Sequence, residues 1–193
     1  EGQTHKGIDD TLKTNTINGL RVIKEISSGM NHFVEKYRAL NKIPEPQFAK
    51  FDVNEWAKEI NEMAKYIIQN EEIKFDINLS LNMNSIVGDK KQLNQVMLNL
   101  IKNAKESFTE YGDKHIHISM QTLRDNNLRI QVEDNGAGIE PQVLEHVFVP
   151  FYTTKMKGSG IGLSISRQIV LNHAGTIAID SSVGKGTTCT VCL

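Results

Sequence analysis

Two asparagines on one apolar segment, Asn99 and Asn103, have the residue type and the spacing of a cation site. They are four residues apart in a stretch whose apolar pattern predicts a helix, so both amides emerge on the same helical face. Asparagine is a poor helix former, and a pair on an otherwise apolar helix needs an explanation. Their amide oxygens suit a hard cation such as magnesium, which prefers oxygen ligands and shares them with phosphates. Two surface amides are the alternative, and we interpret Asn94 of the same segment in that way.

A carboxylate and two glycines follow a predicted strand, in the segment Asp134-Asn135-Gly136-Ala137-Gly138-Ile139. An ordinary turn, which is the alternative interpretation, needs only one glycine. Two glycines at this spacing let a ligand approach the backbone closely. The carboxylate of Asp134 is well placed to accept a hydrogen bond from an exocyclic amine. The segment therefore indicates a binding loop for a group that carries an amine.

A second glycine-rich segment, Gly158-Ser159-Gly160-Ile161-Gly162-Leu163-Ser164, leads directly into a predicted helix. Glycines at a helix start expose backbone N–H groups to an anion, and the helix dipole favours negative charge there. The dinucleotide-binding pattern GxGxxG is absent, and no preceding strand begins a βαβ unit. Just upstream, two threonine hydroxyls and Lys155 fit phosphate contact, whereas Phe148 and Phe151 have the alternative of being core anchors. These segments indicate an anion site, with a flexible loop as the alternative for the glycines.

The elements that must position these groups follow from the apolar periodicity of the chain. Apolar residues spaced as on one face of a helix predict helices at 54–70, with Asn54 as N-cap, at 89–109 and at 161–172. Alternating and turn-bounded stretches predict strands at 48–52, 74–81, 116–123, 128–133, 176–181 and 187–193. Helices interspersed with antiparallel hairpins predict an α+β fold, a two-layer α/β sandwich with a mixed, mainly antiparallel sheet.

Residues 8–41 have the pattern of one long N-terminal helix. Its apolar residues recur at spacings of three and four, which is typical of the seam of a coiled coil or helical bundle; they are Ile23, Ile26, Met30, Phe33, Tyr37 and Leu40. A helix that packs on its own domain is the alternative. The helix must end near Ile43-Pro44-Glu45-Pro46, because proline disfavours helix at the residue before it. We therefore predict a helical stalk over 1–46 and a globular domain over 47–193.

The composition excludes several classes of function. The 22 basic and 23 acidic residues give a net charge of −1, which argues against a nucleic-acid binder held by phosphate contacts. No apolar run approaches the roughly 18–20 residues that span a bilayer. Cys189 and Cys192 lie three apart on a predicted strand and so point to opposite faces, which disfavours a shared metal. Two buried strand cysteines suit a reducing compartment, and we expect a cytoplasmic location.

The order and spacing of the chemical segments resemble the asparagine, first glycine, phenylalanine and second glycine boxes of the GHKL ATPase and kinase superfamily, and specifically those of sensor histidine kinases. The resemblance covers about 48–193. It implies the Bergerat fold, with ATP and Mg²⁺ as ligands. It places Asn99, Asn103 and Lys155 at the catalytic centre, with Asn103 as the metal ligand. It also implies that Asp134 holds the adenine amine, while Gly136 and Gly138 let the base lie close.

The same resemblance assigns the remaining nucleotide-binding residues. They are Phe148, Phe151 and Lys155 in the lid region, Gly158, Gly160, Gly162 and Leu163 at its hinge and phosphate cradle, and Thr188 near the adenine in a final Gly186-Thr187-Thr188 box. In the gyrase, Hsp90 and MutL-like branches, the position of Asn99 is typically acidic. An amide cannot act as a general base. We therefore predict phosphoryl transfer to a protein side chain, achieved by positioning and charge neutralisation. A GHKL protein-serine kinase or anti-sigma factor and a non-catalytic nucleotide-binding scaffold are the alternatives.

The stretch 37–46 resembles the end of the second dimerisation helix in sensor kinases of the nitrogen-regulation type. That family places the acceptor histidine in a histidine–acidic box, and none of the six histidines here has that context. His5 is kept as an alternative acceptor, and we assign structural places to the others: His32, His115, His117, His146 and His173. We expect the acceptor helix to lie upstream of this chain, which then binds ATP without efficient self-phosphorylation. The implied partners are a response regulator receiver domain and a second copy paired through the N-terminal helix. Any membrane contact is expected to come only from segments outside this chain.

Overall fold

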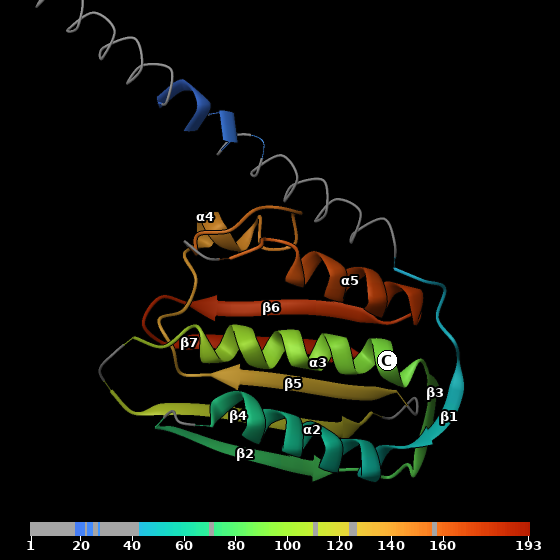
Figure 1. The fold of residues 1–193 in the computed structure, drawn as a ribbon. Helices are drawn as coiled ribbons and strands as arrows, with labels where there is room; N and C mark the ends of the chain where they lie inside the picture. The colour runs from blue at the N-terminus through green and yellow to red at the C-terminus, as the bar shows by residue number, and fades with distance from the viewer. Residues whose placement is uncertain are drawn as a thin grey trace, which may run out of the picture. The chain divides into compact units, whose positions relative to one another are not determined.

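The computed structural model describes residues 18–21, 23–24, 27, 43–69, 72–109, 112–123, 127–155 and 158–193 (Figure 1). The chain divides into two compact units, Glu1–Lys42 and Ile43–Leu193. In the first unit the described residues are helical, and Ile23 of the predicted seam is exposed. The rest of the predicted long helix lies outside the described residues. The helix, its seam and the division at residue 46 therefore stay predictions.

The second unit contains a five-stranded sheet with the order β2-β4-β5-β7-β6. The strands are β2 (Ile73–Ser80), β4 (Lys114–Thr122), β5 (Leu128–Asp134), β6 (Thr176–Ser182) and β7 (Gly186–Cys192). Only the pairing of β2 with β4 is parallel, and the other three pairings are antiparallel. The predicted mixed, mainly antiparallel sheet is thereby confirmed. The structure adds a small antiparallel pair, β1 (Ala49–Asp52) with β3 (Ser85–Gly88), of which β3 was too short to be predicted from its periodicity.

Three helices lie over one face of the large sheet: α2 (Val53–Ile68), α3 (Lys90–Lys105) and α5 (Gly162–Asn172) (Figure 1). One hydrophobic cluster fills the space between the two layers and includes the fully buried Trp56, Ile101, Ile118, Ile130 and Ile169. Cys189 of β7 belongs to this cluster, whereas Cys192 is on the other face, as the strand alternation predicted. The two-layer sandwich is confirmed. None of the helices in the described part of the chain is long and apolar enough to cross a membrane.

Two local predictions about amides are wrong. The N-cap of α2 is Asp52, whose side chain accepts a hydrogen bond from the Glu55 N–H at 2.9 Å, and Asn54 lies inside the helix. The helix therefore begins at Val53, which is fully buried. Asn94 is not a plain surface amide, since its Oδ1 accepts a hydrogen bond from the Trp56 indole N–H at 2.6 Å. A short helix, α4 (Pro141–Leu144), was also not predicted.

The start of α3 matters because this helix carries both candidate asparagines. Asp89 caps it, with Oδ1 accepting from the Gln92 N–H at 3.0 Å and Oδ2 from the Gln47 N–H at 2.8 Å. The N–H of Asp89 donates to His173 Nε2 at 2.9 Å, and His173 Nδ1 in turn donates to the Ile169 carbonyl at 2.8 Å. One residue therefore joins the start of α3 to the end of α5 and to the segment before β1.

We expect Asp89→Ala to lower the free energy of unfolding by about 1–2 kcal/mol, because a helix cap and the Gln47 bond are lost together. Partial desolvation raises the pKa of Asp89, but the backbone N–H donors and the nearby His173 outweigh it, so the net pKa lies below its ordinary value. A carboxylate with a lowered folded-state pKa stabilises the fold above its unfolded-state pKa, and this contribution disappears as pH falls through the folded-state pKa. Urea denaturation should therefore separate wild type from Asp89→Asn at neutral pH and bring them together in acid. A gap of equal size at both pH values would contradict the assignment.

Candidate functional site

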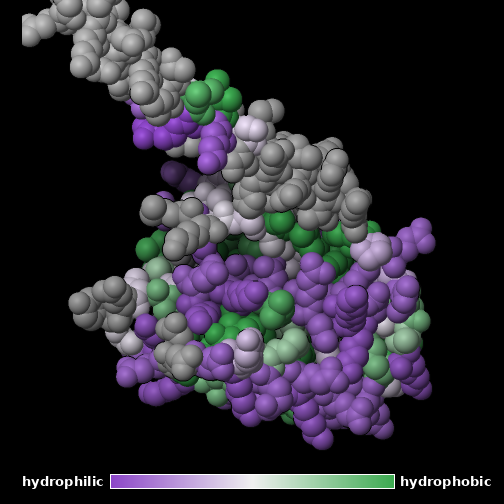
Figure 2. All heavy atoms as spheres, viewed as in Figure 1, coloured by the Kyte–Doolittle hydropathy of each residue, from purple (hydrophilic) through white to green (hydrophobic). Residues whose placement is uncertain are grey.

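The candidate residues meet at an open cavity of about 1130 Å³. Its walls include the C-terminal half of α3, the first turn of α5, the end of β5 with the loop that follows it, and residues 152–155 and 158–160. A second hollow of about 600 Å³ lies between α2 and α3 and is lined by apolar side chains such as Met63 and Leu98, with charged ones at its rim. On the face shown in Figure 2, hydrophilic residues surround a smaller hydrophobic patch over these helices. Only the larger cavity combines helix amides, a buried carboxylate and a glycine-rich helix start.

Asn99 and Asn103 both line the cavity from α3, as their spacing predicted. Asn99 is held in place, because its Nδ2 donates to Ser166 Oγ of α5 at 2.9 Å. A Cβ at Gly162 would lie 2.3 Å from Asn99 Oδ1, so only glycine lets the start of α5 pass this close to the amide. The half-buried Asn103 amide makes no hydrogen bond to another residue in the described part of the chain. Asn99 therefore positions α5 against α3, whereas Asn103 is available to a ligand.

Asp134 ends β5 and faces the cavity with only 6% of its surface exposed. Its Oδ1 accepts two hydrogen bonds, from Ser107 Oγ at 2.7 Å and from the Gly136 N–H at 2.9 Å. Burial raises the pKa of Asp134, and the bonds from Ser107, Gly136 and the Thr187 backbone, with the charge of Lys155, offset only part of that rise. The site thus presents a buried acceptor whose charged form is held in place by the protein.

Ser107 is a further candidate residue that lines the cavity, and the sequence did not predict it. Its hydroxyl lies 2.7 Å from both the Ala104 carbonyl and Asp134 Oδ1, and its own carbonyl accepts the Ala137 N–H at 3.0 Å. A serine at a helix end commonly bonds back to the carbonyl three residues earlier, so the bond to Ala104 could have been predicted from the sequence. The contact with Asp134, 27 residues away, could not. Ser107 therefore links the end of α3 to the loop after β5.

The glycines of that loop are required for packing of the chain on itself. Gly138 lines the cavity and has φ +72°, and a Cβ there would lie 2.1 Å from the Ser182 carbonyl oxygen. Gly136 does not line the cavity, and a Cβ there would lie 2.0 Å from Ser107 Oγ. The loop is thereby pressed between α3 and the turn that joins β6 to β7. This is a different reason for two glycines from the ligand approach predicted from the sequence.

The predicted placement of Thr188 is wrong. In the pairing of β5 with β7, Asp134 is opposite Thr187, and Thr188 is opposite Glu133. Because side chains alternate along a strand, Thr187 shares the cavity face with Asp134 and Thr188 lies on the other face. Thr187 lines the cavity and its backbone helps to hold the Asp134 carboxylate, so it takes the place that was assigned to Thr188.

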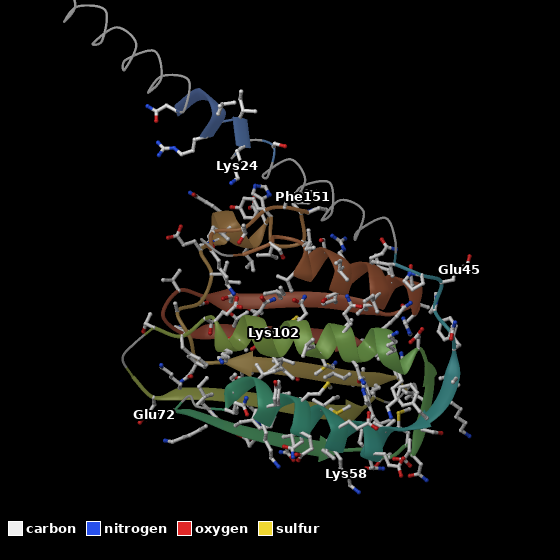
Figure 3. The ribbon with its side chains drawn as sticks, in the orientation of Figure 1. Lys24, Glu45, Lys58, Glu72, Lys102 and Phe151 are labelled. Carbon is white, nitrogen blue, oxygen red and sulfur yellow. The ribbon has the colours of Figure 1, made fainter. Side chains whose placement is uncertain are left out.

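The segment before α5 contributes Lys155 but neither phenylalanine to the lining. Lys155 Nζ lies 2.7 Å from Glu106 Oε2 of the α3 C-cap, beside Thr153 and Thr154. The Phe148 ring lies 5.4 Å from the Arg167 guanidinium instead. Phe151 has φ +68°, and its N–H donates to the Gly160 carbonyl at 2.8 Å; it is labelled in Figure 3, as is Lys102 on α3.

The cavity brings together these predicted residues: Asn99, Asn103, Asp134, Gly138, Lys155, Gly158, Gly160, Gly162 and Leu163.

The N–H groups at the start of α5 and the Asn103 amide fit an anionic ligand that binds together with a hard cation. The N-cap of α5 is Ile161, which offers no side-chain bond to the first turn, and Gly162 and Leu163 of that turn line the cavity. Their region supplies the N–H groups and dipole end that favour an anion. Among the described residues no group of three or more His, Cys, Asp or Glu could hold a metal ion. A cation near Asn103 would therefore need oxygens from the ligand, which is how Mg²⁺ is commonly bound beside phosphates.

Comparison with known proteins supports the same interpretation. Residues 88–193 match the family described as "Histidine kinase-, DNA gyrase B-, and HSP90-like ATPase". Sporulation kinase D of Bacillus subtilis is 34% identical over an alignment of 194 positions that covers 98% of this chain and 36% of that protein. The signal transduction histidine-protein kinase AtoS of Escherichia coli is 30% identical over 172 residues, 89% of this chain and 28% of that protein. The chain thus spans about a third of the length of these relatives.

Solved structures give the same fold. The catalytic domain of histidine kinase ThkA superposes with a TM-score of 0.67 at 28% identity, over 76% of this chain and 95% of that one. ThkA in complex with the response regulator protein TrrA gives a TM-score of 0.69 at 25% identity, over 89% of this chain and 49% of that one. The Bergerat fold predicted from the sequence is confirmed. The chain belongs to the histidine kinase-, DNA gyrase B- and HSP90-like ATPase family, and its fold is that of a histidine kinase catalytic domain.

Proposed function

We propose that this chain binds ATP with Mg²⁺ in the large cavity and transfers the γ-phosphoryl group to a histidine of a dimerisation domain in two-component signalling. The observation that carries the proposal is the convergence of Asp134, Asn103 and the glycine-rich start of α5 on one cavity. Family membership supports ATP as the ligand. AtoS is a histidine-protein kinase and ThkA a histidine kinase, which favours this function over the serine-kinase, anti-sigma and scaffold alternatives.

Base recognition rests on Asp134. Its buried carboxylate would accept a hydrogen bond from the 6-amino group of adenine, and guanine has a carbonyl at that position. A buried acceptor that faces another acceptor is left without a partner, which is costly. Asp134 therefore selects adenine nucleotides, and Ser107 and Gly136 fix the direction in which its carboxylate points.

Binding of the phosphates would depend on residues of α3 and α5. The Asn103 oxygen would hold the metal, the N–H groups at the start of α5 would hold phosphate oxygens, and Lys155 would neutralise their charge. When bound, Mg²⁺ supplies charge neutralisation between the phosphates. Asn99 keeps α5 in register through Ser166 and removes no proton. In this arrangement the receiving histidine supplies its own nucleophilic nitrogen, and the site contributes positioning.

The acceptor and the partners belong to the same proposal. The histidine acceptor would lie on a helix outside this chain, and the predicted seam of the N-terminal helix would pair two copies. The solved complex of ThkA with its response regulator supports a receiver domain as the next phosphate acceptor. Titration calorimetry tests the first step, with MgATP binding expected and MgGTP binding much weaker. Equal affinity for the two nucleotides would overturn the assignment of the base pocket.

We expect little self-phosphorylation when the chain is incubated with radiolabelled MgATP, because no histidine here has the acceptor context. A dimerisation domain from a related kinase, added in trans, serves as the positive control. Acid-labile label retained on the chain alone and lost in a His5→Gln variant would place the acceptor within this sequence and contradict the expectation.

We expect Ser107→Ala to weaken MgADP binding about threefold to tenfold at neutral pH, because one bond to the charged form of Asp134 is lost. The pKa of Asp134 should rise further, so the pH at which affinity disappears on acidification should move upward. Ser164→Ala is the matched control, since its hydroxyl bonds the Ile161 carbonyl three residues earlier at 2.8 Å and no carboxylate. The measurement is MgADP affinity as a function of pH. Equal shifts in the two variants would show that Ser107 acts only on the helix end.

A further inference from the structure

An ion pair at the phosphate end of the cavity joins α3 to the segment before α5. Lys155 Nζ lies 2.7 Å from Glu106 Oε2, with the two side chains 41% and 55% exposed. Both residues line the cavity. Glu106 is the C-cap of α3 and comes three residues after Asn103, so the two side chains emerge on the same side of the helix, about one turn apart. A carboxylate and an amide oxygen thus face the same part of the site.

A carboxylate at Glu106 is unexpected beside bound phosphates, given the other charged residues that line the cavity. The described residues that line the cavity include two lysines and three carboxylates; they are Lys102, Lys155, Glu106, Asp134 and Glu140. Asp134 is committed to Ser107 and Gly136. A triphosphate next to Glu106 would be repelled unless a cation lay between them. In this structure the Lys155 ammonium is the cation on that carboxylate.

We propose that Glu106 is a second oxygen donor to the magnesium of the bound nucleotide, acting with Asn103, and that nucleotide loading exchanges ion pairs. Lys155 leaves Glu106 for a phosphate oxygen, and the metal takes the place of the ammonium on the carboxylate. Mg²⁺ is usually held by one or two carboxylates, substrate phosphates and waters, and a lone amide is a weak anchor for it. The exchange keeps Glu106 and Lys155 each beside an opposite charge before and after loading. This inference rests on the proposed function.

Glu106→Gln tests the exchange, because it keeps the shape of the side chain and removes its charge. Without metal, in excess EDTA, the variant should bind ATP about twofold to fivefold more tightly than wild type, since Lys155 is no longer engaged and a repulsive charge is gone. With metal, the gain in ATP affinity that Mg²⁺ confers should fall about tenfold. Calorimetric titrations of the whole chain with ATP give both values. Mn²⁺ affinity in the presence of ADP, read from the electron paramagnetic resonance of free Mn²⁺, should weaken in parallel.

Glu140→Gln is the matched control, since it removes a carboxylate from the same cavity away from α3. It should change ATP affinity in the same direction and by the same factor with and without metal. Glu106→Asp should recover part of the magnesium effect. Changes of one sign in both conditions for Glu106→Gln would overturn the exchange and leave ATP binding established. Absence of any ATP binding by wild type would instead overturn the proposed function itself.

Discussion

Asp134→Asn is expected to lower the affinity for adenine nucleotides about a hundredfold or more while leaving the fold at least as stable as wild type. The bonds from Ser107 Oγ and from the Gly136 N–H both end on Oδ1, and an asparagine keeps an oxygen there. The other terminal atom becomes an NH₂ group, which is a donor. It would face the adenine amine, another donor, at a residue that is only 6% exposed. Losing a bond to a charged acceptor and burying unpaired donors costs about 3 kcal/mol, which corresponds to the hundredfold loss.

The stability half of this prediction follows from the direction of the pKa shift. Burial raises the pKa of Asp134 above its ordinary value, so the folded state binds this proton more tightly than the unfolded state does. Such a carboxylate costs stability once pH exceeds its folded-state pKa, and the cost is absent below its unfolded-state pKa. The neutral amide does not carry that cost. Urea denaturation should therefore give Asp134→Asn an unfolding free energy equal to or above that of wild type at neutral pH, with the difference shrinking in acid.

Glu133→Gln separates this effect from a general change of charge on β5. Glu133 is the neighbouring residue, exposed on the opposite face of the strand and paired with Thr188. Its substitution should leave MgADP affinity within about twofold of wild type, as expected for an exposed charge outside the cavity. If Asp134→Asn bound MgADP as tightly as Glu133→Gln does, the base-binding role of Asp134 would have to be abandoned.

The parts of the fold that the sequence predicted are those governed by local periodicity. Alternation along the strands and the apolar stripes of α2 and α3 gave the two layers, and the same stripe placed Asn99 and Asn103 on one face. Their meeting with Asp134 was expected because the order of the motifs resembled that of a known family. The two layers and the shared face of the asparagines depend on residues that are close in sequence. The meeting with Asp134 was predicted only by comparing the order of the motifs with that of a known family.

Two misses at the site share a physical cause, since each depends on a pairing between distant segments. Choosing Thr188 over Thr187 was an error of one residue, and a one-residue shift moves a strand side chain to the opposite face. Only the register of β7 against β5 shows which threonine is beside Asp134. The contact between Glu106 and Lys155 spans 49 residues and depends on how the segment before α5 returns to α3. No local spacing contains that information.

The second large effect is expected at Gly138, because two glycines with nearly the same backbone conformation differ in what surrounds them. Gly138 has φ +72° and Gly184 has φ +75°. Either one, changed to alanine, would carry a left-handed backbone that costs about 1–2 kcal/mol. A Cβ at Gly184 meets nothing within 4 Å, whereas one at Gly138 would lie 2.1 Å from the Ser182 carbonyl oxygen. The pair therefore separates backbone strain from steric exclusion.

The clash at Gly138 cannot be relieved by a side-chain rotation, because the atom it meets is backbone. The turn after β6 is also tied to the same loop, since the Gly184 N–H donates to the Ala137 carbonyl at 2.8 Å. An alanine at Gly138 must push the loop away from this turn, and the displacement would reach Asp134 at the start of the loop. We therefore expect Gly138→Ala to cost about 3 kcal/mol or more, against about 1–2 kcal/mol for Gly184→Ala.

Thermal unfolding with and without MgADP measures both consequences. At about 2–4 °C per kcal/mol for a chain of this size, Gly184→Ala should lower the Tm by a few degrees and retain the stabilisation by MgADP. Gly138→Ala should lower the Tm by about twice as much and lose most of that stabilisation, because the displaced loop no longer presents Asp134 to the base. Equal Tm losses would mean that the loop moves aside easily at Gly138. The close packing of this loop on the β6–β7 turn would then not be what holds the carboxylate in the cavity.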